Sequence, residues 1–364
     1  MRIFIPVLDF SRSGGARVLA KLASAWVAAG QRPIFLASQW SEPPYFPTTA
    51  EIYWLDDEGR RVETDVPKNA LRTGPTSVVR HLGSLRRALR RYARPGDVVL
   101  ANHSLTAWPA WLSRCGAKLF YYVQAYEPEY YEVKPGVRAK FLRLMAWASY
   151  RLPLTRIVNG EIYVSFKGLR ARHVVPPGID YALFRPDPAR PPDADLKNRP
   201  VVVGCVGRTE PDKGTIYSVA AFEELVRRGR DVEFRVAYGN IPPAIAAHPR
   251  CRVVVPRDDA ELAEFYRSLD VVLAPGLGQH GAPHYPVMEG MACGVPVVTT
   301  GYLPSAEDNC WLVPERDGAA VADAVDAIVA DPRERRRRVE NALAAIRPFE
   351  WSEVARKMLR LLEA

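Results

Sequence analysis

Short apolar runs alternate with amphipathic stretches in both halves of this sequence, and this alternation limits the folds open to it. An apolar run at residues 1–8 precedes an amphipathic stretch at 16–29, and a run at 200–207 precedes a stretch at 218–228. Each series then continues into a further apolar run. Apolar strands that alternate with helices are typical of parallel sheets covered by helices on both faces. We therefore expect an α/β fold with two doubly wound sheets that face each other.

The length of the chain indicates more than one domain. Its 364 residues exceed the size at which a single hydrophobic core usually stops growing. Residues 187–195 are rich in proline and aspartate, a composition typical of a semi-stiff linker, and we expect the hinge there. This organisation predicts a first domain at 1–185, a second domain at 186–347 and a closing helix at 348–364.

The charge balance favours anionic partners. Fifty Lys and Arg residues against 41 Asp and Glu residues give a formal net charge of +9, with Arg-rich clusters at 86–91 and 333–338. Such surfaces suit nucleic acid, anionic lipid headgroups or sugar nucleotides, while the plain alternative is a solvated helix face. Neither cluster is interleaved with the aromatic residues of a single-strand nucleic-acid platform. We therefore expect no nucleic-acid partner.

Cysteine and histidine usage argues against disulfide and metal chemistry. The five cysteines are odd in number and show no CxxC or Cys/His ligand spacing, and the six histidines form no HExxH motif. No apolar run approaches the roughly 18 residues of a membrane-spanning helix. The run at 1–8 is too short for a secretory signal. The sequence predicts a cytoplasmic protein with no bound metal.

The stretch at 282–299 predicts a helix, a glycine turn and a buried strand. It contains one acid, Glu289, which we expect at the start of the helix. A carboxylate at a helix N-terminus is stabilised by the helix dipole and can accept two hydroxyl hydrogen bonds, as a ribose requires. The alternative is an acid that caps an ordinary helix.

Two glycine-containing loops follow predicted strands and suit an anion. After the strand at 200–207, Arg208 and Lys213 lie five residues apart and can bracket a diphosphate, unless they pair with Glu210 and Asp212 instead. In the first half, glycines 14 and 15 let backbone N–H groups approach an anion at a helix N-terminus. The full dinucleotide fingerprint and the Walker lysine pattern are absent, which argues against simple dehydrogenases and P-loop enzymes.

Polar residues of the first half follow predicted strands. His103 comes just after the strand at 98–101, where a side chain can contact a ligand in the crevice, although a lone histidine is more often structural. The segment 124–131 is dense in amide, carboxylate and tyrosine side chains, which suit sugar hydroxyls and sugar rings. The alternative is a turn whose aromatic rings pack on the core.

Five motifs, taken in order, resemble the GT-B retaining glycosyltransferases of glycosyltransferase family 4, and the resemblance extends over almost the whole chain. They are Gly-Gly-Ala-Arg-Val at 14–18, Val-Pro-Pro-Gly-Ile-Asp at 175–180 with Phe-Arg-Pro at 184–186, the pair of Arg208 and Lys213, Glu-Gly-Met-Ala-Cys-Gly-Val-Pro-Val-Val at 289–298, and Phe-x-Trp at 349–351.

The resemblance implies two Rossmann-like domains that face each other across a cleft, with the C-terminal helix crossing back onto the first domain. It implies that a sugar is transferred from a nucleotide diphosphate sugar, with retention of anomeric configuration and without a metal or other cofactor. The acceptor would be a glycan, a lipid-linked molecule or a small molecule.

The same resemblance assigns roles to the candidate residues. Arg208 and Lys213 would clamp the donor diphosphate, and Glu289 would hold the ribose. The expected donor-binding residues are Gly14, Gly15, Gly207, Arg208, Lys213, His284, Tyr285, Pro286, Val287 and Glu289. The expected catalytic residues are His103, Gln124 and Glu127.

One departure from the family pattern concerns the sugar of the donor. The family has two glutamates separated by seven residues, and the first would fall at Gly281. His280, His284 or backbone amides are the groups that could replace it. The segments 122–128 and 283–286 look like bacterial rhamnosyltransferase-type members that build surface polysaccharides, which makes a deoxyhexose carried on dTDP a reasonable donor.

Other functions stay open at this point. On the same fold the chain could be another nucleotide-sugar enzyme, such as a 2-epimerase or a phosphorylase, or a basic binding protein without catalytic activity. The basic and aromatic stretch at 140–147 could bring the chain to a membrane-bound acceptor as a peripheral contact at the inner membrane face. Packing of that stretch into the core is the alternative.

Overall fold

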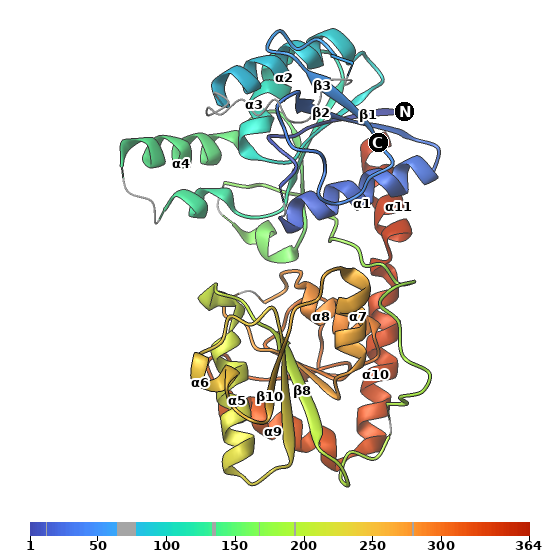
Figure 1. Cartoon of the computed structure of the whole chain (residues 1–364). Coiled ribbons are helices and arrows are strands. Elements are labelled where there is room, and N and C mark those ends of the chain that lie inside the picture. Colours follow the sequence, from blue (N-terminus) through green and yellow to red (C-terminus); the bar gives the residue numbers. More distant parts are fainter. Residues whose placement is uncertain (12, 64–77, 133–135, 167, 193, 279) are drawn as a thin grey trace. The chain divides into compact units, whose positions relative to one another are not determined.

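The computed structural model describes residues 1–11, 13–63, 78–132, 136–166, 168–192, 194–278 and 280–364. It divides into two compact units (Figure 1). Unit 1 comprises Met1–Gly178 together with Trp351–Ala364, and unit 2 comprises Ile179–Glu350.

Unit 1 is built on a seven-stranded sheet in the order β3-β2-β1-β4-β5-β6-β7, in which all neighbouring strands are parallel. The strands are β1 (Arg2–Pro6), β2 (Arg32–Ser38), β3 (Glu51–Leu55), β4 (Val98–Ala101), β5 (Lys118–Val123), β6 (Thr155–Val158) and β7 (His173–Val174). The helices are α1 (Gly14–Ala28), α2 (Val78–Tyr92), α3 (Ser104–Ser113), α4 (Val137–Ser149) and α11 (Trp351–Glu363), with short 3-10 turns η1 (Glu127–Tyr131) and η2 (Glu161–Ser165).

Unit 2 is built on a six-stranded sheet in the order β10-β9-β8-β11-β12-β13, again with parallel neighbours. The strands are β8 (Val201–Val206), β9 (Val232–Ala237), β10 (Cys251–Val254), β11 (Val271–Ala274), β12 (Val297–Thr299) and β13 (Trp311–Leu312). The helices are α5 (Thr215–Arg227), α6 (Pro243–Ala246), α7 (Asp259–Arg267), α8 (Tyr285–Ala292), α9 (Gly318–Ala330) and α10 (Pro332–Ile346), with 3-10 turns η3 (Pro211–Lys213) and η4 (Arg347–Phe349).

The strand order of each sheet reverses at one point. In unit 1 the chain leaves β1 for β2 on one side and later places β4 on the other side, and in unit 2 the same happens at β8 between β9 and β11. Every residue of β4 and β11 is buried, because helices cover both faces of the sheets. The two doubly wound parallel sheets confirm the α/β fold expected from the alternating apolar runs. Ligands of such sheets bind outside the carboxyl ends of the strands at the reversal point.

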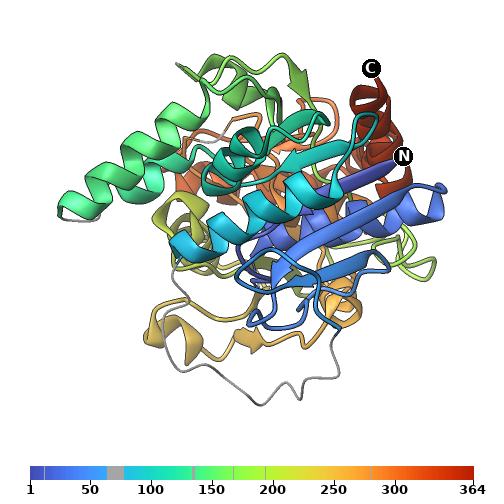
Figure 2. The ribbon, with the colours of Figure 1, turned by 90° about the horizontal axis from the view of Figure 1, so that it is seen from above.

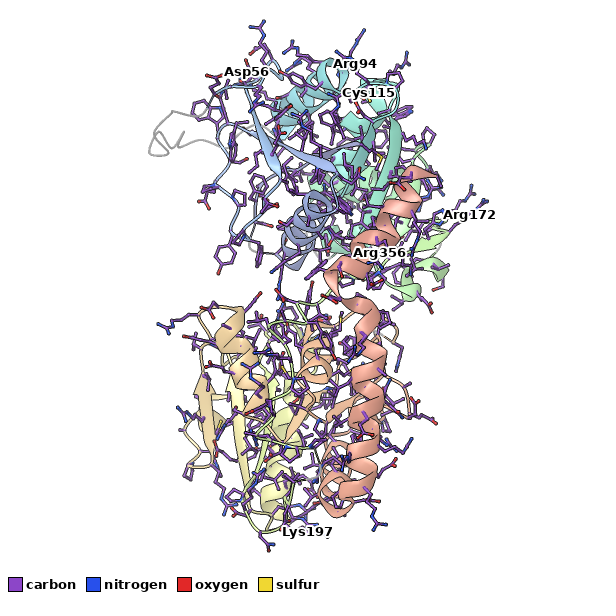
Figure 3. All side chains as sticks on the ribbon, turned by 90° about the vertical axis from the view of Figure 1, so that its right-hand side faces the viewer. Asp56, Arg94, Cys115, Arg172, Lys197 and Arg356 are labelled. Carbon is purple, nitrogen blue, oxygen red and sulfur yellow. The ribbon has the colours of Figure 1, made fainter. Side chains whose placement is uncertain are left out.

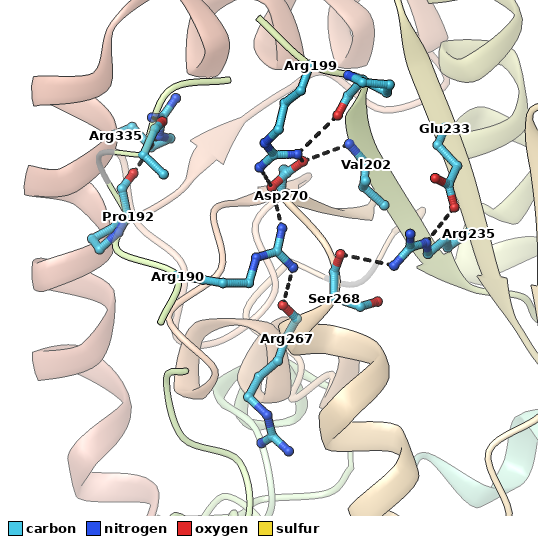
Figure 4. A network of polar contacts seen from close by, with 12 residues as sticks. Arg190, Pro192, Arg199, Val202, Glu233, Arg235, Arg267, Ser268, Asp270 and Arg335 are labelled. Atoms are coloured by element: carbon cyan, nitrogen blue, oxygen red, sulfur yellow. Dashed lines mark hydrogen bonds and ion pairs between the residues drawn. The ribbon is translucent and has the colours of Figure 1, made fainter. Parts of the chain in front are cut away.

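The described residues of the segment predicted as the hinge, 187–192 and 194–195, are held on unit 2, so the expectation of a hinge there was wrong. The guanidinium of Arg335, a residue only 2% exposed, donates to the carbonyl oxygens of Pro192 at 2.6 Å and Ile328 at 2.8 Å, and also to that of Ala194 (Figure 4). Arg190 in turn pairs with Asp270 at 2.7 Å. Composition describes the stiffness of an isolated chain, whereas these partners come from distant residues and fix this segment on unit 2.

The packing of Phe184 explains where unit 2 begins. The boundary falls between Gly178 and Ile179, seven residues before the expected end at 185. Phe184 is fully buried, and its ring packs edge to face on Tyr266 of α7, with ring centroids 6.3 Å apart. Residues 179–185 therefore belong to unit 2, and Phe184 is buried in it.

The last helix, α11, packs within unit 1. Its apolar side, which includes Val354, Met358 and Leu362, is buried. The indole N–H of Trp26 on α1 donates to the carbonyl oxygen of Ala355 at 3.1 Å. Figure 3 shows Arg356 on this helix, which returns the end of the chain to the unit that contains its beginning.

Candidate functional site

The loop after β8 is shaped by two glycines. A Cβ on Gly207 would lie 1.6 Å from the carbonyl oxygen of Gly239, and a Cβ on Gly214 would lie 1.8 Å from that of Pro275. Gly214 also adopts a left-handed conformation with φ at +70°. Both positions therefore require glycine. The second contact brings the loop after β8 against the loop after β11, which is the reversal point of this sheet.

The start of α5 lies in this loop and suits an anion. The backbone N–H of Arg208 donates to Thr215 Oγ1 at 2.9 Å, and this hydroxyl donates back to the carbonyl of Arg208 at 3.1 Å. Gly214 occupies the cap position, and no side chain among the described residues caps the helix there. An α-helix N-terminus carries partial positive charge. The loop therefore presents a helix dipole together with the two cations Arg208 and Lys213.

In this structure both cations of the loop have carboxylate partners. This is the alternative that the sequence left open, in which Arg208 and Lys213 pair with Glu210 and Asp212. Arg208 pairs with Glu210 at 2.8 Å, and Lys213 lies 3.3 Å from Asp212. The hydrogen bond from Arg208 lowers the pKa of Glu210 to about 2. The side chains of the Arg208 pair are about half exposed, at 48% and 47%. Exposed pairs of this kind contribute only about 0–1 kcal/mol, so a diphosphate can replace these carboxylates at small cost.

His284, the cap residue of α8, lies close to the same cations. Its ring stacks on Tyr302 with centroids 4.1 Å apart. Burial, followed by the positive charges of Lys213 and Arg208, lowers the pKa of His284 to about 3. Nδ1 of this ring is buried and has no hydrogen-bond partner among the residues that the structure describes. The structure therefore brings Arg208, Lys213 and a neutral His284 together in unit 2.

Glu289 lies deeper than the sequence predicts. Helix α8 begins at Tyr285, with Pro286 in its first turn, so Glu289 is in the second turn and not at the start. The expectation of an acid at the helix N-terminus was wrong. Proline favours the first helical turn, so the helix begins earlier in the sequence, beside Pro286. The residue is 2% exposed, and its Oε2 accepts the hydroxyl hydrogen bond of Tyr266 at 2.9 Å. Tyr285, Pro286 and Val287 form the turn before it.

An acid from a distant segment lies at the loop where the family has its first glutamate. Glu315 Oε1 accepts the backbone N–H of Gly278 at 2.6 Å and lies 3.1 Å from Nε2 of His280. The N–H of Gly281 itself donates to the carbonyl of Gly301 at 2.8 Å. Sequence reasoning missed Glu315, because it lies 34 residues beyond Gly281 and no motif marks it. Only the pairing of β12 with β13 brings its segment to this edge of the sheet.

In unit 1, the glycine pair and Gln124 lie together. Helix α1 begins at Gly14, and the Ser13 hydroxyl accepts the N–H of Ala16 at 3.3 Å. Nε2 of Gln124 donates to the carbonyl of Gly15 at 3.4 Å, and a Cβ on Gly15 would meet the Gln124 side chain at 3.3 Å. Gly15 therefore permits a close approach of Gln124.

His103 and Glu127 also lie together, at the start of α3. The Glu127 carboxylate is buried, accepts the Ser104 N–H at 2.8 Å and 3.0 Å, and accepts the Tyr121 hydroxyl at 2.7 Å. His103 Nδ1 lies 3.4 Å from this carboxylate and accepts the N–H of Leu105 at 3.0 Å. Glu127 thus holds the helix N-terminus, while the side chain of His103 is 27% exposed. Of the pair, His103 is the one that can reach a ligand.

Tyr126 of the 124–131 segment packs on the core, as the alternative interpretation predicts. Its ring packs on Phe166 with centroids 4.9 Å apart and stacks on Tyr150 at 5.8 Å. Tyr130 of the same segment is 51% exposed, so packing on the core accounts for Tyr126 and not for Tyr130.

Comparison with solved structures defines the class of fold. A sucrose-phosphate synthase from Thermosynechococcus elongatus matches with a TM-score of 0.74 and 20% identity, covering 99% of this chain and 98% of that chain. Anabaena HepE in complex with UDP and glucose matches with a TM-score of 0.70 and 15% identity, covering 100% of both chains. The chain therefore has the GT-B fold of glycosyltransferases.

Comparison of sequences identifies the domain in unit 2. Residues 200–331 match the family model described as Glycosyl transferases group 1. A D-inositol 3-phosphate glycosyltransferase of Xylanimonas cellulosilytica is 34% identical over 213 residues, which cover 51% of this chain and 50% of that protein. A phosphatidyl-myo-inositol mannosyltransferase of Mycobacterium leprae is 33% identical over 145 residues, or 38% of this chain and 37% of that protein. The chain spans about half the length or less of these curated relatives. Residues 200–331 are thus similar to glycosyltransferases of group 1.

The described residues contain neither a metal-ion cluster nor a membrane-spanning helix. Within them, no group of three or more His, Cys, Asp or Glu side chains is placed to hold a metal ion. No helix in the described ranges is long and apolar enough to cross a membrane.

Proposed function

We propose that this chain transfers a sugar from a nucleotide diphosphate sugar to an acceptor, with the donor diphosphate held by the loop at residues 207–214. The observation that carries this proposal is the convergence of Arg208, Lys213 and the start of α5 at the reversal point of the unit 2 sheet. Each of these groups favours negative charge. The match of residues 200–331 to a glycosyltransferase family supports the same assignment.

The chemical role of the loop is to neutralise the charge that grows on the leaving diphosphate. The Arg208 guanidinium offers parallel N–H donors and Lys213 offers a compact charge. Both leave their exposed carboxylate partners when the diphosphate arrives, because two charge-assisted bonds to phosphate outweigh two exposed ion pairs. The glycine contacts described above fix the loop before the donor binds, so little reorganisation accompanies the reaction.

We assign the ribose of the donor to Glu289. The hydrogen bond from Tyr266 fixes the orientation of its carboxylate. The sugar of the donor is assigned to the loop around Gly281, where Glu315 and His280 supply polar groups in place of the missing first glutamate. In unit 1, His103, Gln124 and the Gly14–Gly15 pair remain the groups proposed to meet the reacting sugar or the acceptor.

The names of similar proteins suggest candidate donors and acceptors. The matched solved protein from Anabaena contains UDP and glucose, and the curated relatives are named for inositol phosphate and phosphatidylinositol acceptors. We therefore place UDP- and GDP-hexoses beside dTDP-rhamnose as candidate donors. The rhamnosyltransferase-like subgroup and retention of configuration stay predictions from the resemblance.

A panel of nucleotide sugars tests the proposed activity. The full chain is incubated with UDP-, GDP- and dTDP-sugars, with water or added inositol phosphate to receive the sugar, and release of the nucleotide diphosphate is measured with and without EDTA. We expect turnover of at least one donor that EDTA leaves unchanged and that Lys213→Ala lowers about tenfold or more, the effect of losing one charge-assisted bond. Lys197→Ala is the matched control, because Lys197 precedes β8 at the opposite end of that strand (Figure 3).

The products of the same panel separate the alternatives. Release of a sugar 1-phosphate on addition of phosphate would indicate a phosphorylase, and a changed sugar on an intact nucleotide would indicate an epimerase. Absence of turnover with every donor, despite nucleotide binding, would contradict the proposed activity and favour a binding protein without catalysis.

A further inference from the structure

Helix α4 presents large apolar side chains to solvent. Val137 is 84% exposed, Phe141 58%, Leu144 57% and Trp147 38%. Spacings of four, three and three residues place them on one side of the helix. The views from the side and from above both show α4 projecting from the body of unit 1 (Figures 1 and 2). A contiguous exposed apolar strip of this kind marks an interaction site.

The opposite side of α4 anchors the helix to unit 1. Its buried residues are the small side chains Ala139, Ala146 and Ser149. Trp108 of α3 donates its indole N–H to the carbonyl of Met145 at 3.3 Å. A surface helix usually buries its large apolar residues and exposes its polar ones. In α4 the small residues are buried and the large ones are outside, so the core does not account for the apolar strip.

Basic residues lie on both sides of Val137, the most exposed residue of the apolar strip. Arg138 lies about 100° from Val137 around the helix, and Lys140 lies about 60° from it in the other direction, between Leu144 and Trp147, as follows from 3.6 residues per turn. Helix α4 contains three basic residues, the third being Arg143, and no acidic one. The guanidinium of Arg151 lies 3.2 Å from the centre of the Trp147 ring. A tryptophan beside cationic groups is typical of the membrane–water interface.

A hollow of about 540 Å³ adjoins the strip and has mixed charge. It is lined by Lys140, Arg143, Leu144 and Trp147 of α4, and by Glu129 and Glu132. Arg143 pairs with Glu132 at 2.8 Å, with both side chains about half exposed. Burial, followed by the charge of Glu132, raises the pKa of Glu129. Glu132 therefore offsets the charge of Arg143, while Lys140 lies at the rim shared by the hollow and the strip and Arg138 lies outside the hollow.

We propose that α4 lies flat on an anionic lipid bilayer, with Val137, Phe141 and Leu144 in the boundary between headgroups and acyl chains. Arg138 and Lys140 then contact lipid phosphates on either side of the helix. An amphipathic helix with an apolar strip and basic flanks binds membranes through these two contributions together. Charge complementarity selects the anionic surface as the occupant. This surface does not depend on the proposed sugar transfer.

Vesicle sedimentation tests the surface with the full chain. Vesicles of phosphatidylcholine alone are compared with vesicles in which about a third of the lipid is phosphatidylglycerol. We expect binding to the anionic vesicles only, falling with added salt. Arg138→Gln with Lys140→Gln should weaken it about 25-fold, since each basic residue near the surface is worth about fivefold. Arg90→Gln with Arg91→Gln, on α2, is the matched charge control and should change it little.

The apolar strip is tested separately. Phe141→Ser with Leu144→Ser should abolish vesicle binding, while thermal midpoint and nucleotide-sugar turnover stay unchanged because these side chains are outside the core. Val79→Ser with Val255→Ser, at positions 77% and 67% exposed, is the matched control and should bind as the wild type does.

Three outcomes would overturn the inference. They are absence of binding to anionic vesicles, equal binding by the Phe141→Ser/Leu144→Ser variant, and sedimentation velocity that shows a dimer which this variant dissociates. The last result would make α4 an interface with a second copy of the chain. Turnover of the variant in solution is scored independently, so failure of this surface and failure of the proposed activity are distinguishable.

Discussion

At the scale of single residues, the conformation of the loop at residues 207–214 depends on two glycines, which have no side chain. At Gly207 and Gly214 an added Cβ would lie 1.6 Å and 1.8 Å from the carbonyl oxygen of a neighbouring segment. The backbone is therefore packed directly against other backbone at both positions, and the loop has little freedom to move. Arg208 and Lys213 extend from this fixed backbone. Their positive charges help to lower the pKa of His284, which caps α8. This effect indicates that the loop after β8 and the start of α8 belong to one site.

His284 gives the site a measurable pH dependence. Its pKa is about 3 in the folded chain against about 6.5 in an unfolded one. The unfolded state therefore binds more protons between these values, and stability is lost as the pH falls from 6.5 towards 3. We expect His284→Phe, which keeps a ring on Tyr302, to lose less unfolding free energy than the wild type between pH 6.5 and 4. Urea unfolding at several pH values measures this, and parallel curves for the two proteins would contradict it.

At the scale of elements, Arg335 on α10 fastens the segment before β8. Its guanidinium satisfies the carbonyls of Pro192, Ala194 and Ile328 (Figure 4). Arg335→Met keeps most of the side-chain volume but leaves these acceptors without their donor, so we expect a loss of about 3 kcal/mol in unfolding free energy. Arg337→Met on the same helix removes an exposed pair with Glu334 and should cost less than about 0.5 kcal/mol. Equal costs in denaturant unfolding would show that the segment is not held in this way.

The elements also show what the sequence could and could not predict. Apolar runs predicted strands β1, β4 and β8, because buried parallel strands need apolar residues on both faces. The start of α8 lies four residues before Glu289, because Pro286 favours the first helical turn. Glu315 and Arg335 could not be found, because their partners come from topology and no local pattern marks them. The exposure of the apolar side chains of α4 could not be predicted from the sequence either. Periodicity shows which side of a helix is apolar, but it does not show which other elements cover that side.

At the scale of the whole molecule, two sheets of the same design carry different sets of candidate residues. Unit 2 contains Arg208, Lys213 and the residues that match the glycosyltransferase group 1 model. Unit 1 contains His103, Gln124, the glycine pair and the exposed helix α4. This division leads to the central claim, which is that nucleotide binding depends on the loop of unit 2.

Isothermal titration of UDP, GDP and dTDP into the full chain tests that claim most directly. The titration is repeated with Arg208→Ala/Lys213→Ala and with the control Arg227→Ala/Lys197→Ala, whose side chains lie outside the site. Loss of two charge-assisted bonds to phosphate should cost about 3 kcal/mol, or about a hundredfold in Kd, while the control binds as the wild type does. Unchanged affinity in the Arg208→Ala/Lys213→Ala protein would contradict the account.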